Sequence, residues 1–248
     1  MLIANVFNPQ LLQGSSAEET IFSSGIGSFY DEIRRVIFDT KVTISPRTTS
    51  KKGQDSTGAP GLAASLNVAM GNALISLGWD HLKAPGGTAD ISTVDWFKAK
   101  KSNVAYAPTA LGIGLEIQFG NNYQFNEDIK RLSEAYIAGI IQAGIAIVPS
   151  NALAKHKADR GAYFSDAKSK LERHYQTLYG AQARKIPPIM IIAIQHDGYN
   201  DDPSGLFTIT PVTYSPVEGS EIFIPTSQPE MTNKIKPVLK PTNKKVRS

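Results

Sequence analysis

The segment 114–122 alternates between apolar and polar side chains with the period of a β-strand. Successive side chains of a strand point to opposite faces. One face carries Leu115, Ile117 and Phe119, and the other carries Glu116 and Gln118. A carboxylate and an amide on one face of a mid-chain strand must face water or meet partners that satisfy them. The apolar face therefore predicts core, and the polar face predicts a candidate site.

Longer patterns predict the elements around this strand. Apolar positions at helical spacing predict helices at 28–38, with Ser28 as N-cap, and at 61–78, 126–143 and 166–178. Continuous apolar runs predict strands covered on both sides at 145–148 and 189–194, and shorter strands are expected at 206–209 and 221–224. The expected fold class is α/β or α+β, with a mixed central sheet flanked by helices.

A second strand, predicted at residues 91–97, carries Asp95. If it pairs with the first strand, Asp95 and Glu116 converge and can hold a divalent cation through hard oxygen ligands, with Gln118 beside them. Such a cation lowers the pKa of a bound water and polarises a phosphoryl oxygen, which suits phosphodiester hydrolysis. Asp90 is a rival for the metal-binding Asp. We prefer Asp95, because it lies in an apolar strand context whereas Asp90 follows a Gly-rich turn.

An Asp on one strand followed by Glu-x-Gln on the next resembles the BglII and BstYI group of type II restriction endonucleases, within the PD-(D/E)XK superfamily. In that group Gln stands where most nucleases of the superfamily have Lys. The order of elements is similar over residues 90–197. The resemblance implies a Mg²⁺-dependent nuclease in which Asp95 and Glu116 bind the metal and Gln118 positions water or phosphate.

The loop at residues 149–160 is the predicted DNA-reading segment. Asn pairs with an adenine edge and Arg or Lys with guanine, while other cations hold phosphates. The resemblance also places residues just past the Glu-x-Gln strand in the major groove. The candidate DNA-binding residues are Asn121, Asn122, Ser150, Asn151, Lys155, His156, Lys157 and Arg160. A basic surface loop is the alternative.

Three further polar pairs have both a functional and a structural interpretation. Asp80 and His81, expected in a turn, are weak site candidates and fit an N-cap or surface role better. Arg131 and Tyr136 would face a subunit interface by the resemblance, with core and solvent positions weighed first. His196 and Asp197 lack a nucleophile motif or metal-ligand spacing beside them, so they are expected to be strand-end polar groups, with a position facing DNA as the alternative.

Composition narrows the class of protein. A hydrophobic share of 41% and a charged share of 19% indicate a globular chain, and no apolar run approaches the length of a membrane span. With no cysteine and no secretory leader pattern, a cytoplasmic location is expected. The net charge of +4 favours a polyanionic partner. However, the tail at 232–248 carries six basic and no acidic residues, so the rest of the chain is close to neutral.

The sequence thus predicts a single nuclease domain spanning 1–248, with a core at about 60–200, a flexible loop at about 45–60 and a basic tail at about 232–248. The expected function is Mg²⁺-dependent cleavage of double-stranded DNA at a short palindromic site. Two-fold symmetry of the site implies a homodimer. A structure-specific or repair nuclease without sequence readout, and a non-catalytic DNA-binding protein on the same scaffold, are the alternatives.

Overall fold

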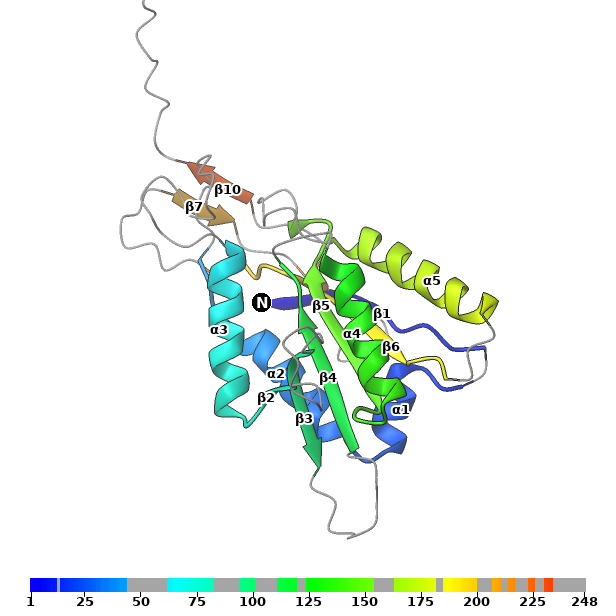
Figure 1. Cartoon of the computed structure of the whole chain (residues 1–248). Helices are drawn as coiled ribbons and strands as arrows, with labels where there is room; N and C mark the ends of the chain where they lie inside the picture. The colour runs from blue at the N-terminus through cyan, green and yellow to red at the C-terminus, as the bar shows by residue number, and fades with distance from the viewer. Residues whose placement is uncertain are drawn as a thin grey trace, which may run out of the picture.

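A mixed sheet of six strands forms the centre of the molecule (Figure 1). The computed structural model describes residues 1–12, 14–43, 62–82, 94–100, 111–119, 124–153, 163–181 and 185–199, together with the backbone of four short strands beyond them. In order across the sheet, the strands are β1 (Leu2–Phe7), β6 (Ile189–Gln195), β5 (Ala143–Pro149), β4 (Leu111–Ile117), β3 (Val94–Lys100) and β2 (Asp80–Leu82).

The middle of the sheet is parallel and its edges are antiparallel. Strands β4, β5 and β6 run parallel to one another, whereas β1, β3 and β2 each pair antiparallel with their neighbours. Every residue of β5 and β6 is buried, as expected for central strands covered on both faces. The predicted α/β class is confirmed.

Helices cover both faces of the sheet. One face packs against α1 (Ala17–Ser23), α2 (Gly27–Asp39) and α3 (Leu62–Ser76) around the odd-numbered positions of β4. The other face packs against α4 (Phe125–Ile137) and α5 (Phe164–Gly180). Figure 1 shows α4 in front of β4 and β5, with α2 behind the sheet. The polar positions of β4 therefore face α4, inside the molecule and not in solvent.

Two adjacent glycines let α4 lie close to the sheet. Gly114 of β4 pairs with Gly144 of β5. A Cβ atom built on Gly114 would lie 2.9 Å from Cδ2 of Leu132 and 3.0 Å from Cδ1 of Ile141, and one on Gly144 would lie 3.1 Å from Leu132 Cδ1. The side chain of Leu132 thus fills the space above a flat pair of glycines. This close approach brings the first turns of α4 within hydrogen-bonding reach of the polar face of β4.

Four short strands follow the main sheet, and two of them were predicted. The observed strands are β7 (Phe207–Thr210), β8 (Tyr214–Pro216), β9 (Phe223–Pro225) and β10 (Glu230–Asn233). They form two separate antiparallel pairs, β7 with β10 and β8 with β9. The predicted loop at 45–60 and most of the predicted basic tail lie outside the described residues.

Several predicted boundaries were wrong for local reasons. Helix α2 begins at Gly27 with Ile26 at the N-cap and no side-chain cap, so Ser28 is not its cap. Helix α4 ends at Ile137, because Gly139 adopts a left-handed conformation with φ 74° and interrupts the helical pattern expected as far as residue 143. Asp80 opens the edge strand β2 and is not in a turn. The side chain of His81 lies outside the described part of the chain.

His196 and Asp197 are polar groups at the end of β6, as predicted, but His196 points into the interior and not toward a DNA-binding surface. Its side chain is fully buried: Nε2 lies 2.6 Å from the carbonyl oxygen of Val42, and Nδ1 accepts a hydrogen bond from the backbone N–H of Gly198 at 2.9 Å. With Nδ1 as acceptor, Nε2 must carry the proton and donate, which defines a neutral imidazole. Asp197 forms ion pairs with Lys41 at 2.8 Å and with the amino group of Met1 at 3.1 Å. His196 and Asp197 therefore hold the end of β6 against the segment that follows α2.

Candidate active site

The register of the sheet brings Asp95 and Glu116 to adjacent strands. Trp96 of β3 pairs with Leu115 of β4, so the next step of the same antiparallel register places Asp95 opposite Glu116. An Asp95 carboxylate oxygen accepts a hydrogen bond from the backbone N–H of Ile117 at 3.3 Å. Burial is the main cause that raises the pKa of Glu116, and the charge of Asp95 adds to this rise. The two acids singled out in the sequence therefore share one end of one sheet face.

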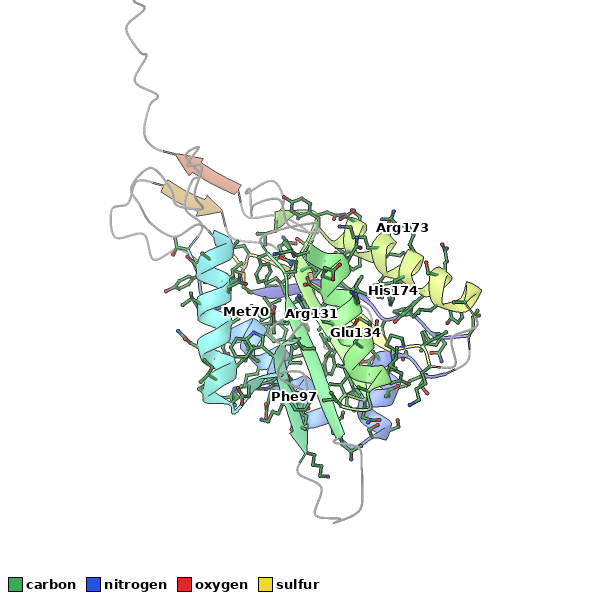
Figure 2. All side chains as sticks on the ribbon, in the orientation of Figure 1. Met70, Phe97, Arg131, Glu134, Arg173 and His174 are labelled. Carbon is green, nitrogen blue, oxygen red and sulfur yellow. The ribbon has the colours of Figure 1, made fainter. Side chains whose placement is uncertain are left out.

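Glu116 is held by an arginine from α4. Its side chain is fully buried, and both carboxylate oxygens accept hydrogen bonds from Arg131. The Arg131 Nε donates to Oε1 and the Nη2 to Oε2, each at 2.9 Å. The Arg131 side chain is 19% exposed. Figure 2 labels Arg131 beside α4. Bidentate pairs of this kind are among the strongest charge-assisted hydrogen bonds in proteins.

Asp128 extends the same network to Gln118. Arg131 Nη2 also donates to Asp128 Oδ1 with a short contact, and Gln118 Nε2 donates to Asp128 Oδ2 at 2.9 Å. Asp128 is 1% exposed and Gln118 is 8% exposed. The chain of contacts runs from Glu116 through Arg131 and Asp128 to Gln118. Glu116 in β4 and Gln118 directly after it thus have their partners on the first two turns of α4.

Burial dominates the electrostatics of these acids. Removal from water raises the pKa of Glu116 to about 9; the hydrogen bonds from Arg131 oppose this rise, and the charges of Asp95 and Asp128 add to it. Burial likewise raises the pKa of Asp128 to about 6, against the hydrogen bond from Gln118 and the charge of Arg131. Hydrogen bonding to Glu116 raises the pKa of Arg131 further above its usual value. The guanidinium is permanently charged, but it does not fully neutralise the acids around it.

Sequence reasoning missed the roles of Asp128 and Arg131. Asp128 was assigned to the helix dipole, because acids in a first helical turn commonly face solvent there. For Arg131 a core position was weighed ahead of a subunit interface, and its inward contacts with Glu116 agree with the core position, but the partner itself was not predicted. Tyr136 is half buried and packs against the hydrophobic cluster between α4, α5 and the sheet. The usable signal was the spacing of three residues between Asp128 and Arg131, which places both on one helix face.

The predicted DNA-reading residues are described only in part. Ser150 is 2% exposed, and its Oγ accepts a hydrogen bond from the Leu153 backbone N–H at 3.1 Å. Asn151 Oδ1 accepts from the N–H and the hydroxyl of Ser165, each at 3.1 Å, and so ties the end of β5 to the start of α5. The remaining candidates lie outside the described residues: Asn121, Asn122, Lys155, His156, Lys157 and Arg160. Asp90 also lies outside them.

The donor chemistry of the cluster fits a hard divalent cation, whereas its present arrangement does not hold one. Carboxylate oxygens from Asp95, Glu116 and Asp128 are the ligands that Mg²⁺ prefers. Among the described residues, however, no group of three or more acidic or histidine side chains is arranged to hold a metal ion. The oxygens of Glu116 instead receive the guanidinium of Arg131. Binding of a cation at Glu116 therefore requires these contacts to change.

A mixed sheet covered by helices on both faces, with acids on adjacent strands near its end, defines a restriction-endonuclease-like fold. Residues 15–194 match the family model described as restriction endonuclease BglII/BglIII, and the chain belongs to this family. It is thus a type II site-specific deoxyribonuclease that binds double-stranded DNA, as the Glu-x-Gln strand indicated. Restriction endonucleases of this kind generally use divalent metal ions. No curated protein matches the chain.

The family match extends beyond the segment on which the resemblance was based. It begins before α1 and ends inside β6, so it includes both helices α1 and α2 on the far face of the sheet.

No helix within the described residues is long and apolar enough to cross a membrane.

Proposed function

We propose that this restriction endonuclease cuts both strands of a short palindromic DNA site in a Mg²⁺-dependent reaction, with Asp95 and Glu116 as metal ligands. The observation that carries the proposal is the placement of the two acids opposite each other on β3 and β4, with Glu116 fully buried. Two carboxylates on adjacent strands repel each other, and a divalent cation bound between them would offset this repulsion. The whole chain, 1–248, would form one nuclease domain acting in the cytoplasm.

The residues of the site have distinct roles in this proposal. Asp95 and Glu116 bind the cation, which when bound supplies an activated water and neutralises charge on the phosphate. Gln118 holds Asp128 through its amide nitrogen, and Asp128 in turn orients Arg131. Attack of water on phosphorus in line with the scissile bond breaks the bond to the 3′ oxygen, leaving a 3′-hydroxyl and a 5′-phosphate. In this proposal the loop at residues 149–160 reads the bases, although the buried Ser150 does not reach them.

The direct test is digestion of a fully sequenced plasmid with the purified protein, in Mg²⁺ and in EDTA, followed by sequencing of the fragment ends. We expect discrete ends that share one short palindrome in Mg²⁺ and intact plasmid in EDTA. Smeared products would indicate a structure-specific or repair nuclease without sequence readout. DNA binding without any cleavage would contradict the catalytic assignment and favour a DNA-binding scaffold.

We also propose a homodimer that associates through the outer face of α3. This helix contains no charged residue, and it exposes 62% of Val68 and 60% of Ile75. These two side chains lie seven residues apart and so share one face of the helix. A two-fold axis brings identical surfaces together, so an uncharged apolar helix can pair with its own copy without repulsion between like charges.

Replacing both Val68 and Ile75 with lysine is expected to convert the dimer into a monomer at micromolar concentration, as measured by analytical ultracentrifugation. The matched control is Ile137→Lys at the end of α4, a position that is 50% exposed and also apolar. We expect this control to remain dimeric. If Ile137→Lys dissociates the dimer and the α3 variant does not, the interface lies at α4.

A further inference from the structure

One guanidinium occupies the oxygens that a metal ion would use. Arg131 takes both oxygens of Glu116 and one oxygen of Asp128, and Gln118 takes the remaining oxygen of Asp128. These contacts lie in the interior, because Glu116 and Asp128 are at most 2% exposed. A ligand that approaches Glu116 from the side that faces α4 therefore meets Arg131 first.

The charges of the cluster explain why an arginine is tolerated beside these acids. Three carboxylates interact in this part of the described structure, those of Asp95, Glu116 and Asp128, and Arg131 is the cation whose hydrogen bonds reach two of them. Buried like charges repel strongly unless a cation lies between them. Arg131 thus stabilises the metal-free cluster, although a net negative charge remains.

The position of Arg131 also gives it an alternative partner. Asp128 lies three residues earlier on the same face of α4 and bonds the same Nη2 atom that reaches Glu116. Because Gln118 fixes the other oxygen of Asp128, Asp128 is held in place whether or not Arg131 remains on Glu116. The side chain of Arg131 can leave Glu116 without becoming an unpaired buried charge.

We propose that Arg131 is a positioning residue that serves as an internal counter-ion for Glu116, and that a divalent cation binds Glu116 only when Arg131 withdraws to Asp128. The inference rests on the proposed function in one respect, namely that Glu116 is a metal ligand. Arg131 therefore competes with the metal ion: it keeps the acids together in the metal-free protein and weakens their affinity for metal.

The test is the affinity of the full-length protein for Mn²⁺ without DNA, measured by electron paramagnetic resonance, for wild type, Arg131→Met and Arg131→Lys. Removal of a charge-assisted competitor should tighten Mn²⁺ binding by about tenfold or more in Arg131→Met. Arg131→Lys keeps the charge but loses the bidentate geometry, so its affinity for Mn²⁺ should lie between those of wild type and Arg131→Met. The control is Arg173→Met on α5, an exposed arginine also labelled in Figure 2, which should bind Mn²⁺ as wild type does.

Thermal unfolding separates a competing role from a purely structural one. Arg131→Met should unfold at a lower temperature than wild type without metal, and added Mn²⁺ should raise its unfolding temperature by more than it raises that of wild type. Unchanged or weaker Mn²⁺ binding by Arg131→Met would overturn the inference. If that variant does not fold, Arg131→Lys decides alone: Mn²⁺ binding no tighter than wild type contradicts the proposal.

Glu116→Gln distinguishes failure of this inference from failure of the proposed function. Wild-type Mn²⁺ affinity in Glu116→Gln would remove Glu116 as a metal ligand, and with it the basis for a competing Arg131. Loss of Mn²⁺ binding in Glu116→Gln together with unchanged binding in Arg131→Met would retain the metal site and reject only the role of Arg131.

Discussion

Replacing Glu116 with glutamine is expected to lower the single-turnover rate of DNA cleavage by on the order of 10³-fold or more. The amide has the size of the carboxylate but lacks its negative charge, so it loses the ionic bond to the proposed metal ion. It also places an NH₂ group beside the guanidinium of Arg131, where both oxygens now accept hydrogen bonds. Binding of DNA without metal should change by less than about fivefold, since Glu116 is fully buried.

Glu134→Gln is the matched control for this experiment. Glu134 belongs to the same helix as Arg131 and is labelled in Figure 2, but its side chain is 47% exposed and pairs with Lys130 at 4.0 Å. Exposed ion pairs of this kind contribute little to the stability of the fold. This variant should therefore cut DNA at the wild-type rate. Cleavage by Glu116→Gln within tenfold of wild type, with Glu134→Gln unaffected, would contradict the role of Glu116.

Gly114→Val should damage stability and the site together. The added atoms would press on Leu132 and Ile141, whose nearest atoms lie 2.9 and 3.0 Å from a Cβ at this position. Overpacking of a well-packed interior typically costs about 1–3 kcal/mol of unfolding free energy. Because Leu132 seats α4 on the sheet, its displacement should also move Asp128 and Arg131 away from Glu116. We expect urea unfolding at lower denaturant concentration and a loss of cleavage activity.

A double-mutant cycle identifies the clash as the cause. Leu132→Ala alone should cost about 2–5 kcal/mol through the cavity that it leaves. Combined with Gly114→Val, it should cost less than the sum of the two single changes, because the valine enters the space that the leucine vacates. Additive free energies would show that Gly114→Val acts on the strand itself and that the glycine pair does not seat α4.

The sheet and its polar strand could be predicted from the sequence because the signals are local. Alternation in residues 115–119 fixes which side chains share a face, and the apolar runs of β5 and β6 are typical of central parallel strands. The pairing of Asp95 with Glu116 also depends on the register of β3 against β4, which the structure supplies and the sequence did not fix. The family resemblance rested on these residues, and the family match confirmed it.

The helical half of the site could not be predicted in the same way. Asp128 and Arg131 are common residues near the start of a helix, and most such residues face solvent. Their burial depends on how closely α4 approaches the sheet, which is set by Gly114 and Gly144 in two separate strands. The two glycines and the two charged residues are too far apart in the sequence for a local pattern to connect them.

The first two elements of the chain were missed for opposite reasons. Strand β1 has an irregular register between Ile3 and Asn5, which breaks the alternation by which strands are identified. Helix α1 had a usable signal, because Ser16 and Glu19 form a capping box with reciprocal hydrogen bonds. A serine followed three residues later by glutamate before an apolar pair is readable from the sequence alone.

The glycine pair beneath Leu132 also constrains how this protein can diverge. A larger side chain at Gly114 would press on Leu132 and Ile141, and one at Gly144 on Leu132 and Ile189, so a smaller residue at position 132 would relieve both. Neither change is tolerated well alone, so the two must arise together or through a weakened intermediate. Descendants of this chain should therefore inherit the glycines, the leucine and the buried charges beside them as one unit, whereas the proposed DNA-reading loop is free of this constraint.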